Sequence, residues 1–248
     1  MKLVFLGTTG YHPNNIRQTA CLMFPELGLI FDAGTGLFRA HQLICTRKLD
    51  IYLSHAHLDH VFGLTFLFDV LQGHQVDRVT IHGRAVDLQA VDEHLFHESL
   101  FPVRLPHELR PLDGPEEVAG AGKLIHFPVD HPGGAVGYRV DWPGASFAYV
   151  TDTVATEDAK YLDLIAGVDL LVHECYFRDD RAEWAEKTGH SYTTPVAKLA
   201  KKAEVGRMVM VHVNPMCEDD DPIDIELARS IFPATEVGTD FLEVEFGK

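Results

Sequence analysis

Three histidines and one aspartate stand within seven residues, directly after a short apolar run. Apolar residues alternate in the run at 49–53, which predicts a buried β-strand, and residues 54–60 then read Ser-His-Ala-His-Leu-Asp-His. In extended backbone His55 and His57 project to the same side, so they can share one ion. Burying this much polarity beside a core strand without a metal would be costly, so the cluster predicts a metal site.

The other two residues of the cluster open a different segment. Asp59 and His60 lie at the start of residues 58–73, where apolar residues recur at helical spacing, so their side chains turn toward a different point in space. That placement suits a second ion, because the metals of two-metal hydrolases lie about 3.5–4 Å apart. Imidazole and carboxylate are ligands that Zn²⁺, Mn²⁺ and Fe all accept. The alternative is a surface cluster of solvated histidines in a chain that holds fifteen of them.

Length and composition place the chain among ordinary globular proteins. Its 248 residues suffice for one sizeable core, with 46% hydrophobic and 23% charged residues, so we expect a single domain over residues 1–248. No stretch approaches the roughly 20 apolar residues of a membrane helix, and no charged segment followed by an apolar one opens the chain. We therefore expect a cytoplasmic protein that does not bind membranes. The four cysteines form no C-x-x-C pair, so a sulfur-based zinc site is not predicted.

The charge balance of the chain is acidic. The 21 Lys and Arg residues against 37 Asp and Glu residues give a formal net charge of −16. Proteins that grip long nucleic acids normally cluster Lys and Arg to displace counterions. The balance therefore argues against a long nucleic acid as the partner and favours a small-molecule substrate.

Strand-like and helix-like segments alternate along the chain, which predicts a mixed, layered α/β fold. His131, Asp152 and His212 each stand at the end of an apolar run. Taken alone, each is more often a structural residue than a ligand, but after the first cluster they supply what two ions still lack. Strands are predicted at 2–6, 20–24, 28–31, 50–53, 79–82, 124–128, 135–140, 146–150, 170–173, 208–213 and 241–246, and helices at 58–73, 85–96, 159–166, 195–203 and 226–230.

In their order along the chain, the cluster at 55–60, His131, Asp152 and His212 resemble the ligand set of the metallo-β-lactamase superfamily. The resemblance covers nearly the whole chain. It implies an α/β fold, a four-layer αβ/βα sandwich, with two divalent metal ions at one edge of the two sheets, Zn²⁺ or else Mn²⁺ or Fe. Within the superfamily, four segments look most like the tRNase Z and related phosphodiesterase branch. They are Val-Phe-Leu-Gly-Thr at 4–8, Phe-Asp-Ala-Gly-Thr-Gly at 31–36, His-Glu-Cys at 173–175 and Gly-His-Ser at 189–191.

Carried over residue by residue, the resemblance assigns each ligand to an ion. Asp152 would bridge the two metals; its alternative role is to cap a helix near 156–166, since Thr-Asp-Thr is good capping chemistry. Asp59 would also lie beside the attacking water and orient it or accept its proton. The ligands of one ion would be His55, His57 and His131, and those of the other Asp59, His60 and His212.

The resemblance also implies two residues that handle or position a proton. Hydroxide activated by the metals would attack the substrate, His190 would donate a proton to the departing alkoxide, and Glu174 would hold the imidazole in place. The alternative for both is a structural role, because Glu174 ends a predicted strand and His190 lies in a turn. Asp32, at the end of the strand predicted at 28–31, either orients a metal-binding histidine or stabilises a turn.

Together these residues predict a dinuclear metal-dependent hydrolase, with small or cyclic phosphodiesters as the preferred substrates. The alternatives are a carboxylic ester, lactone or thioester hydrolase, an RNA-processing endonuclease related to tRNase Z, and a non-catalytic, metal-stabilised binding protein. In tRNase Z a long arm that grips transfer RNA interrupts the fold, whereas only twenty residues separate His131 and Asp152 here. The resemblance leaves a homodimer open as the oligomeric state.

Overall fold

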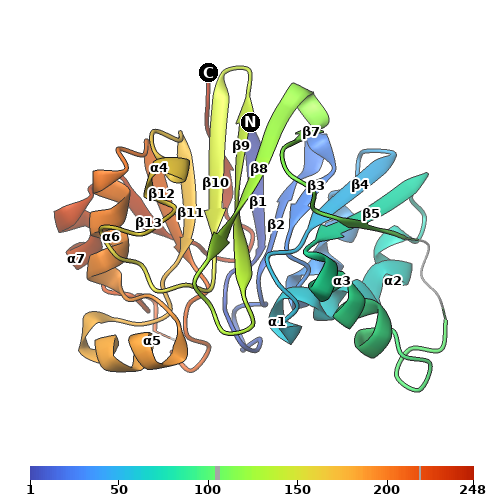
Figure 1. Ribbon diagram of the computed structural model, residues 1–248, viewed down its shortest axis with the longest axis horizontal. Coiled ribbons are helices and arrows are strands. Elements are labelled where there is room, and N and C mark those ends of the chain that lie inside the picture. Colours follow the sequence, from blue (N-terminus) through green and yellow to red (C-terminus); the bar gives the residue numbers. More distant parts are fainter. Residues whose placement is uncertain (104–106, 218) are drawn as a thin grey trace. The chain divides into compact units, whose positions relative to one another are not determined.

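The computed structural model describes residues 1–103, 107–217 and 219–248 of the chain (Figure 1). It divides into two compact units, each with its own seven-stranded sheet. The single domain predicted over residues 1–248 stays a prediction. Unit 1 consists of Met1–Pro13, Arg17–Asp113 and Asp240–Glu245, and unit 2 of Asn14–Ile16, Gly114–Thr239 and Phe246–Lys248.

The sheet of unit 1 is antiparallel on one side and parallel on the other. Its strands are β1 (Lys2–Gly7), β2 (Cys21–Phe24), β3 (Leu29–Phe31), β4 (Lys48–Tyr52), β5 (Arg78–Gly83), β6 (Glu108–Pro111) and β14 (Glu243–Glu245). The order is β14-β1-β2-β3-β4-β5-β6, antiparallel from β14 to β3 and parallel from β3 to β6. Phe31 pairs with Tyr52, so the segments that follow β3 and β4 leave the sheet side by side.

Short helices bury the apolar residues of this sheet. Val61, Leu64 and Leu67 belong to the same buried cluster as Ile30 and Ile51 of the sheet. This packing places the start of the first α-helix next to the ends of the parallel strands. The helices are η1 (Pro25–Leu27), η2 (Thr35–Gln42), α1 (Leu58–Val61), η3 (Phe62–Phe66), α2 (Leu67–Leu71), α3 (Ala85–Ala90) and the π-helical η4 (Val91–Leu95).

The helix predicted at 58–73 is divided into the three short pieces α1, η3 and α2. The Gly63 N–H donates to Ala33 O (2.8 Å), and the Ala33 N–H donates to His60 O (2.7 Å). A Cβ on Gly63 would lie 2.0 Å from Gly34 O, so only glycine permits this close approach. Tertiary contact therefore overrides the helical periodicity and ties the segment that carries His60 to the end of β3.

The sheet of unit 2 has the same mixed character. Its strands are β7 (Glu116–Val118), β8 (Gly122–Val129), β9 (Ala135–Trp142), β10 (Ala145–Val150), β11 (Leu170–Glu174), β12 (Arg207–Val211) and β13 (Thr235–Val237). The order is β13-β12-β11-β10-β9-β8-β7, parallel from β10 to β13 and antiparallel from β7 to β10. Val150 pairs with His173, and Glu174 pairs with Val211, so β10, β11 and β12 end at one edge.

Helices also cover this second sheet. Val196 and Leu199 are buried in one cluster with Leu171 and Met210 of the strands. The helix predicted at 159–166 is shorter than expected, because it begins only at Leu162. The capping role considered for Asp152 is therefore wrong, since Tyr161 occupies the N-cap position of that helix. The helices are η5 (Ala119–Ala121), α4 (Leu162–Ile165), η6 (Asp179–Arg181), α5 (Ala182–Thr188), α6 (Thr193–Lys202) and α7 (Ile225–Ile231).

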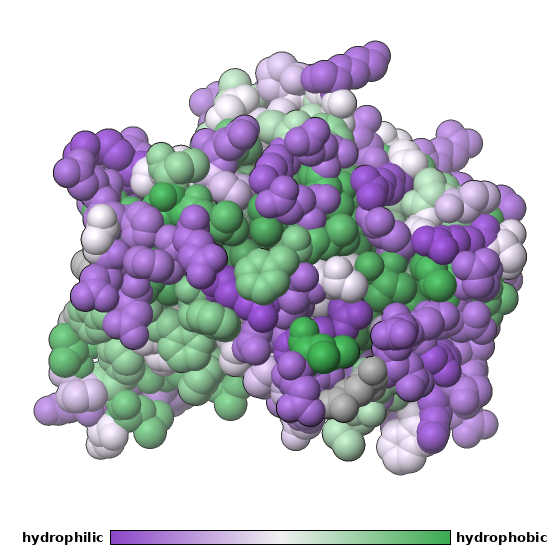
Figure 2. All heavy atoms as spheres, turned by 180° about the vertical axis from the view of Figure 1, so that it is seen from behind, coloured by the Kyte–Doolittle hydropathy of each residue, from purple (hydrophilic) through white to green (hydrophobic). Residues whose placement is uncertain are grey.

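Every predicted strand overlaps an observed one, and the predicted α/β class is confirmed. The predictions missed β6, β7 and β13, which are three or four residues long and lie at sheet edges, where partial exposure weakens the hydrophobic signal. No helix in the described part of the chain is long and apolar enough to cross a membrane. On the face in Figure 2, groups of hydrophobic residues lie among hydrophilic ones.

Candidate metal centre and catalytic residues

A buried carboxylate sets the orientation of one predicted ligand in unit 1. Asp32 follows β3 with φ at 58°, in the left-handed region, and its side chain is fully buried. Its Oδ1 accepts from the Ser54 N–H (2.7 Å), and its Oδ2 accepts from the Ser54 hydroxyl (2.9 Å) and from His60 Nδ1 (2.8 Å). Because an ionised carboxylate only accepts, the proton of the neutral imidazole is on Nδ1. Nε2 of His60 is then the nitrogen that carries a lone pair.

The other predicted ligands of unit 1 gather around His60. The ring centroids of His55 and His60 lie 4.3 Å apart, and those of His55 and His57 lie 4.4 Å apart. Asp59 Oδ2 lies 3.3 Å from His60 Nε2 and accepts from the Tyr11 N–H (2.7 Å). His55 and His60 are buried, so the alternative of a solvated surface cluster is wrong for these two, whereas His57 is exposed. We call these four residues the N-terminal cluster.

In unit 2 the polar residues follow the ends of neighbouring strands. Asp152 comes two residues after β10, and His212 comes directly after β12. Asp152 Oδ1 lies 3.2 Å from His212 Nε2, and its Oδ2 lies 3.5 Å from His131 Nε2. Each carboxylate oxygen therefore faces one imidazole. The Thr151 hydroxyl donates to Asp152 Oδ1 (2.6 Å), which holds the carboxylate in this orientation.

An unusual backbone conformation orients the side chains of Asp152 and His212. Asp152 has φ at 49° and His212 has φ at 56°, both in the left-handed region that non-glycine residues rarely adopt. Such a conformation costs of order 1–3 kcal/mol and concentrates at functional sites. Nδ1 of His131 lies 3.3 Å from Gly189 O, which can only accept, so the neutral ring carries its proton on Nδ1 and presents Nε2 to Asp152.

The predicted pair of His190 and Glu174 is in contact. Glu174 is fully buried, and its Oε1 lies 3.2 Å from Nδ1 of His190. The carboxylate also accepts from the Thr153 N–H (2.6 Å) and the Ser191 N–H (3.2 Å). These two backbone donors satisfy the buried carboxylate and fix its orientation, so it can hold the imidazole. We call His131, Asp152, Glu174, His190 and His212 the C-terminal cluster.

His190 lies within reach of two of the predicted ligands of unit 2. Ligand atoms of His190, Asp152 and His212 all lie within 4.8 Å of one another. The Tyr176 ring stacks on the His190 ring, with centroids 4.6 Å apart and planes inclined by 18°. Tyr176 was not among the residues predicted from the sequence, although its position two residues after Glu174 was a usable signal. His190 is thus held from one side by a carboxylate and from another by an aromatic face.

A second buried histidine, His173, belongs to the support of this cluster. Nδ1 of His173 donates to Glu174 O (2.7 Å), so Nε2 accepts from the Tyr161 hydroxyl (2.9 Å). Burial lowers the pKa of the His173 imidazole, although the backbone carbonyl and the charge of Glu174 oppose this. Burial likewise raises the pKa of the Tyr161 hydroxyl, with the charge of Glu174 contributing. The neutral pair therefore anchors the end of β11.

Comparison with known proteins adds sequence and structural relatives. A family model described as the β-lactamase superfamily domain matches residues 29–213. Ribonuclease Z of Archaeoglobus fulgidus is 24% identical over an alignment of 301 residues, which covers 98% of this chain and 97% of that protein. Ribonuclease BN of Escherichia coli K12 is 30% identical over 308 residues, which covers 97% and 98%, respectively. The metallo-β-lactamase fold protein YhfI from Bacillus subtilis has a TM-score of 0.81 at 20% identity, covering 98% of this chain and 99% of that one.

Proposed function

Because this chain belongs to the metallo-β-lactamase superfamily, we propose that it is a metal-dependent hydrolase acting on phosphodiesters. The expected family, its tRNase Z-like character and the fold are confirmed by the matches. The proposed cofactors are two divalent metal ions, with Zn²⁺, Mn²⁺ and Fe all compatible with the ligand types. The proposed ligands are His55, His57, Asp59 and His60 of unit 1 and His131, Asp152 and His212 of unit 2.

Hydrogen bonding within each unit supports these assignments. In His60 and His131 an acceptor faces Nδ1, Asp32 Oδ2 in one case and Gly189 O in the other. Fixing the proton on Nδ1 leaves Nε2 as the metal-binding atom, which is the usual arrangement of metal-ligating histidines. Asp152 directs one oxygen toward each neighbouring imidazole of unit 2, as a bridging carboxylate would.

Asp59 and His190 would each handle a proton at a different point of the reaction. Divalent ions, when bound, make water more acidic and stabilise the negative charge that develops on phosphate oxygens. The Asp59 carboxylate would orient the attacking water or accept its proton. His190 would donate a proton to the departing alkoxide, and Glu174 would keep that imidazole in the required orientation. The contact between His190 and the buried Glu174 carries the phosphodiester proposal, because an alkoxide is a poor leaving group that needs an acid.

The proposed substrate is a small or cyclic phosphodiester. The net charge of −16 opposes a long polyanion, and only twenty residues separate His131 and Asp152. Both ribonuclease alignments run over more residues than the 248 of this chain, so those proteins carry segments without a counterpart here. RNA processing is the second candidate function, and the full-length similarity to ribonuclease BN and ribonuclease Z favours it.

The first experiment is hydrolysis of bis(p-nitrophenyl) phosphate by protein that has been stripped of metal and reloaded with Zn²⁺ or Mn²⁺. Asp59→Asn and His190→Ala are assayed beside it, with metal content measured by mass spectrometry. We expect metal-dependent turnover that Asp59→Asn abolishes. His190→Ala should retain its metal and lose activity mainly on substrates with poor leaving groups, because p-nitrophenolate leaves without an acid.

Three outcomes would contradict parts of the proposal. Turnover of only a lactone or a thioester would replace it with a carbonyl hydrolase. Loss of metal from His190→Ala would make His190 a ligand and not the acid. Full metal loading without hydrolysis of any of these substrates, or of a short transfer RNA precursor, would favour a metal-stabilised binding protein.

A further inference from the structure

A cavity of about 460 Å³ lies wholly within unit 2, beside the C-terminal cluster. It is lined by the segment that follows β11, by the start of α5 and by the segment that follows β12. Its volume falls within the range of small-molecule sites. None of the roles proposed above uses it.

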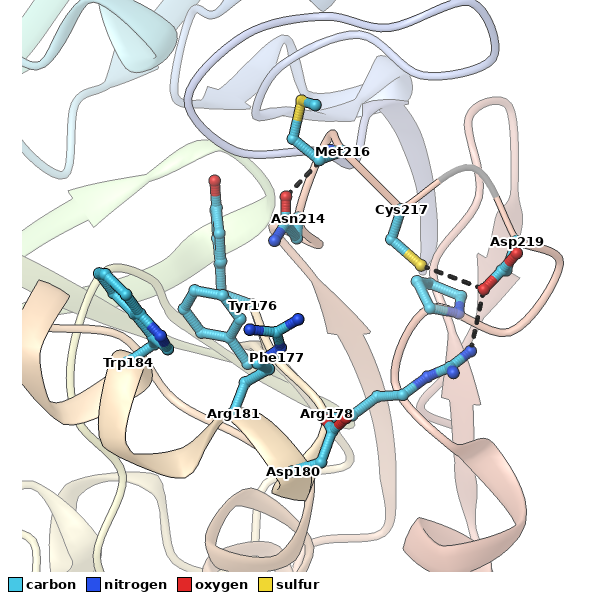
Figure 3. A pocket seen from close by; sticks show the side chains of 11 residues that line it. Tyr176, Phe177, Arg178, Asp180, Arg181, Trp184, Asn214, Met216, Cys217 and Asp219 are labelled. Atoms are coloured by element: carbon cyan, nitrogen blue, oxygen red, sulfur yellow. Dashed lines mark hydrogen bonds and ion pairs between the residues drawn. The ribbon is translucent and has the colours of Figure 1, made fainter.

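Three aromatic side chains line the cavity. Tyr176 and Phe177 have ring centroids 4.8 Å apart, and Trp184 stands across from them on α5 (Figure 3). Trp184 is 51% exposed, and the Lys187 ammonium lies over one face of its ring, 5.0 Å from the centroid. Aromatic faces bind planar rings by stacking, and every nucleobase offers such a ring.

Polar groups of the cavity suit the remainder of a nucleotide. Arg178 is held by Asp221 O and by Asp219 Oδ2 (3.4 Å), whereas Arg181 has no side-chain hydrogen bond or ion pair to any described residue. Figure 3 shows the Arg181 guanidinium directed toward the space between Phe177 and Asn214. A guanidinium in such a place can bind phosphate or the acceptors of a base edge.

Asn214 contributes an oriented hydrogen-bond donor. Its Oδ1 accepts from the Met216 N–H (2.9 Å), which turns the Nδ2 group to the other side of the amide. An amide in a fixed orientation can distinguish bases by their hydrogen-bonding edges. The cavity therefore combines aromatic stacking surfaces with two polar groups. These are the Arg181 guanidinium, which makes no ion pair with any described residue, and the oriented amide of Asn214.

The cavity shares a wall with the proposed acid. Tyr176 lines the cavity and also stacks on His190 at 4.6 Å. A ring attached close to the scissile phosphate could thus occupy the cavity while His190 reaches the leaving oxygen. We propose that this cavity binds the nucleobase of a nucleotide substrate, with Trp184 and Tyr176 as stacking surfaces and Arg181 and Asn214 as polar contacts. This inference rests on the proposed phosphodiesterase function.

Equilibrium binding tests the cavity without requiring catalysis. The chain has two tryptophans, and Trp142 is 5% exposed and donates to Ala119 O (2.9 Å), so quenchers and ligands act mainly on Trp184. We expect saturable quenching by adenosine 5′-monophosphate and little response to ribose 5-phosphate, which lacks the base. Arg181→Met should weaken nucleotide binding as followed by the same quenching. Glu186→Ala, on α5 but outside the cavity lining, should bind like the wild type.

Hydrolysis of a 3′–5′ dinucleotide provides the second measurement. Trp184→Ala should lower kcat/KM about 5- to 150-fold with unchanged metal content, as expected for one lost stacking contact, and Trp184→Phe should recover part of it. Equal quenching by the nucleotide and by ribose 5-phosphate, or an unchanged kcat/KM in Trp184→Ala, would overturn the inference and leave the phosphodiesterase intact. Base-dependent binding without hydrolysis of any phosphodiester would support the cavity and refute the proposed activity.

Discussion

Replacing Asp32 by Asn should exchange the tautomer of His60. The oxygen of the introduced amide can keep the bond from the Ser54 N–H that Asp32 Oδ1 accepts at 2.7 Å. The amide NH₂ then stands where Oδ2 accepts from His60 Nδ1 at 2.8 Å, so a donor meets a donor. The imidazole relieves this conflict by moving its proton to Nε2. A protonated Nε2 cannot bind a metal ion.

The size of the effect follows from the cost of restoring the old tautomer. Metal binding would require the proton to return from Nε2 to Nδ1 of His60. The N–H at Nδ1 would then face the NH₂ of the introduced amide, and two buried donors without an acceptor cost about 1–3 kcal/mol. We therefore expect about 10- to 100-fold weaker metal binding, the range typical for lost partners of ligating histidines. The metal-free variant should lose only about 1 kcal/mol or less of its free energy of unfolding, because the new tautomer keeps a hydrogen bond between the introduced amide and His60.

Two measurements check this reasoning. Competition with a chromophoric chelator gives the Zn²⁺ affinity, and long-range ¹H–¹⁵N correlation spectra of the metal-free protein report which nitrogen of His60 is protonated. Asp50→Asn is the matched control, because it makes the same change in a carboxylate that faces His82 Nε2 (3.1 Å), a histidine that is not among the proposed ligands. Wild-type affinity in Asp32→Asn, or a proton that stays on Nδ1, would refute the tautomer argument.

Three further predictions concern the stability of the fold. Gly63→Ala should lower the free energy of unfolding by about 1–3 kcal/mol in a denaturant titration, because its Cβ would lie 2.0 Å from Gly34 O; an unchanged midpoint would contradict this. The lowered pKa of buried His173 means that the unfolded state, with its ordinary value of 6.5, takes up the proton first, so stability should fall as pH drops through 6.5 toward 5. His173→Gln should flatten that profile, and an equally steep slope in the variant would assign the proton elsewhere. Chelation of bound metal should lower the unfolding temperature, and Zn²⁺ at 100 times its Kd should restore about 2.7 kcal/mol; no shift would argue against metal linkage to folding.

Much of the secondary structure could be predicted from the pattern of residues. The buried parallel strands β10, β11 and β12 carry unbroken apolar runs, which are a strong signal. The helix at 58–73 failed as a prediction because the hydrogen bond from the Gly63 N–H to Ala33 O is a tertiary contact that periodicity does not record. Asp152 likewise lost its proposed capping role, because the helix begins ten residues later, at Leu162.

The sequence by itself determined which residue types could bind metal and which of them stand at strand ends. A strand that ends in His or Asp can be recognised locally, since the apolar run and its terminus are contiguous. Only the tertiary structure decided which partners those residues have: Asp32 with His60, 28 residues apart, and Glu174 with His190, 16 residues apart. Both contacts depend on backbone turns and on strand order, and strand order is set by long-range packing. Proton positions on the imidazoles follow from these contacts, so the sequence alone could not assign them.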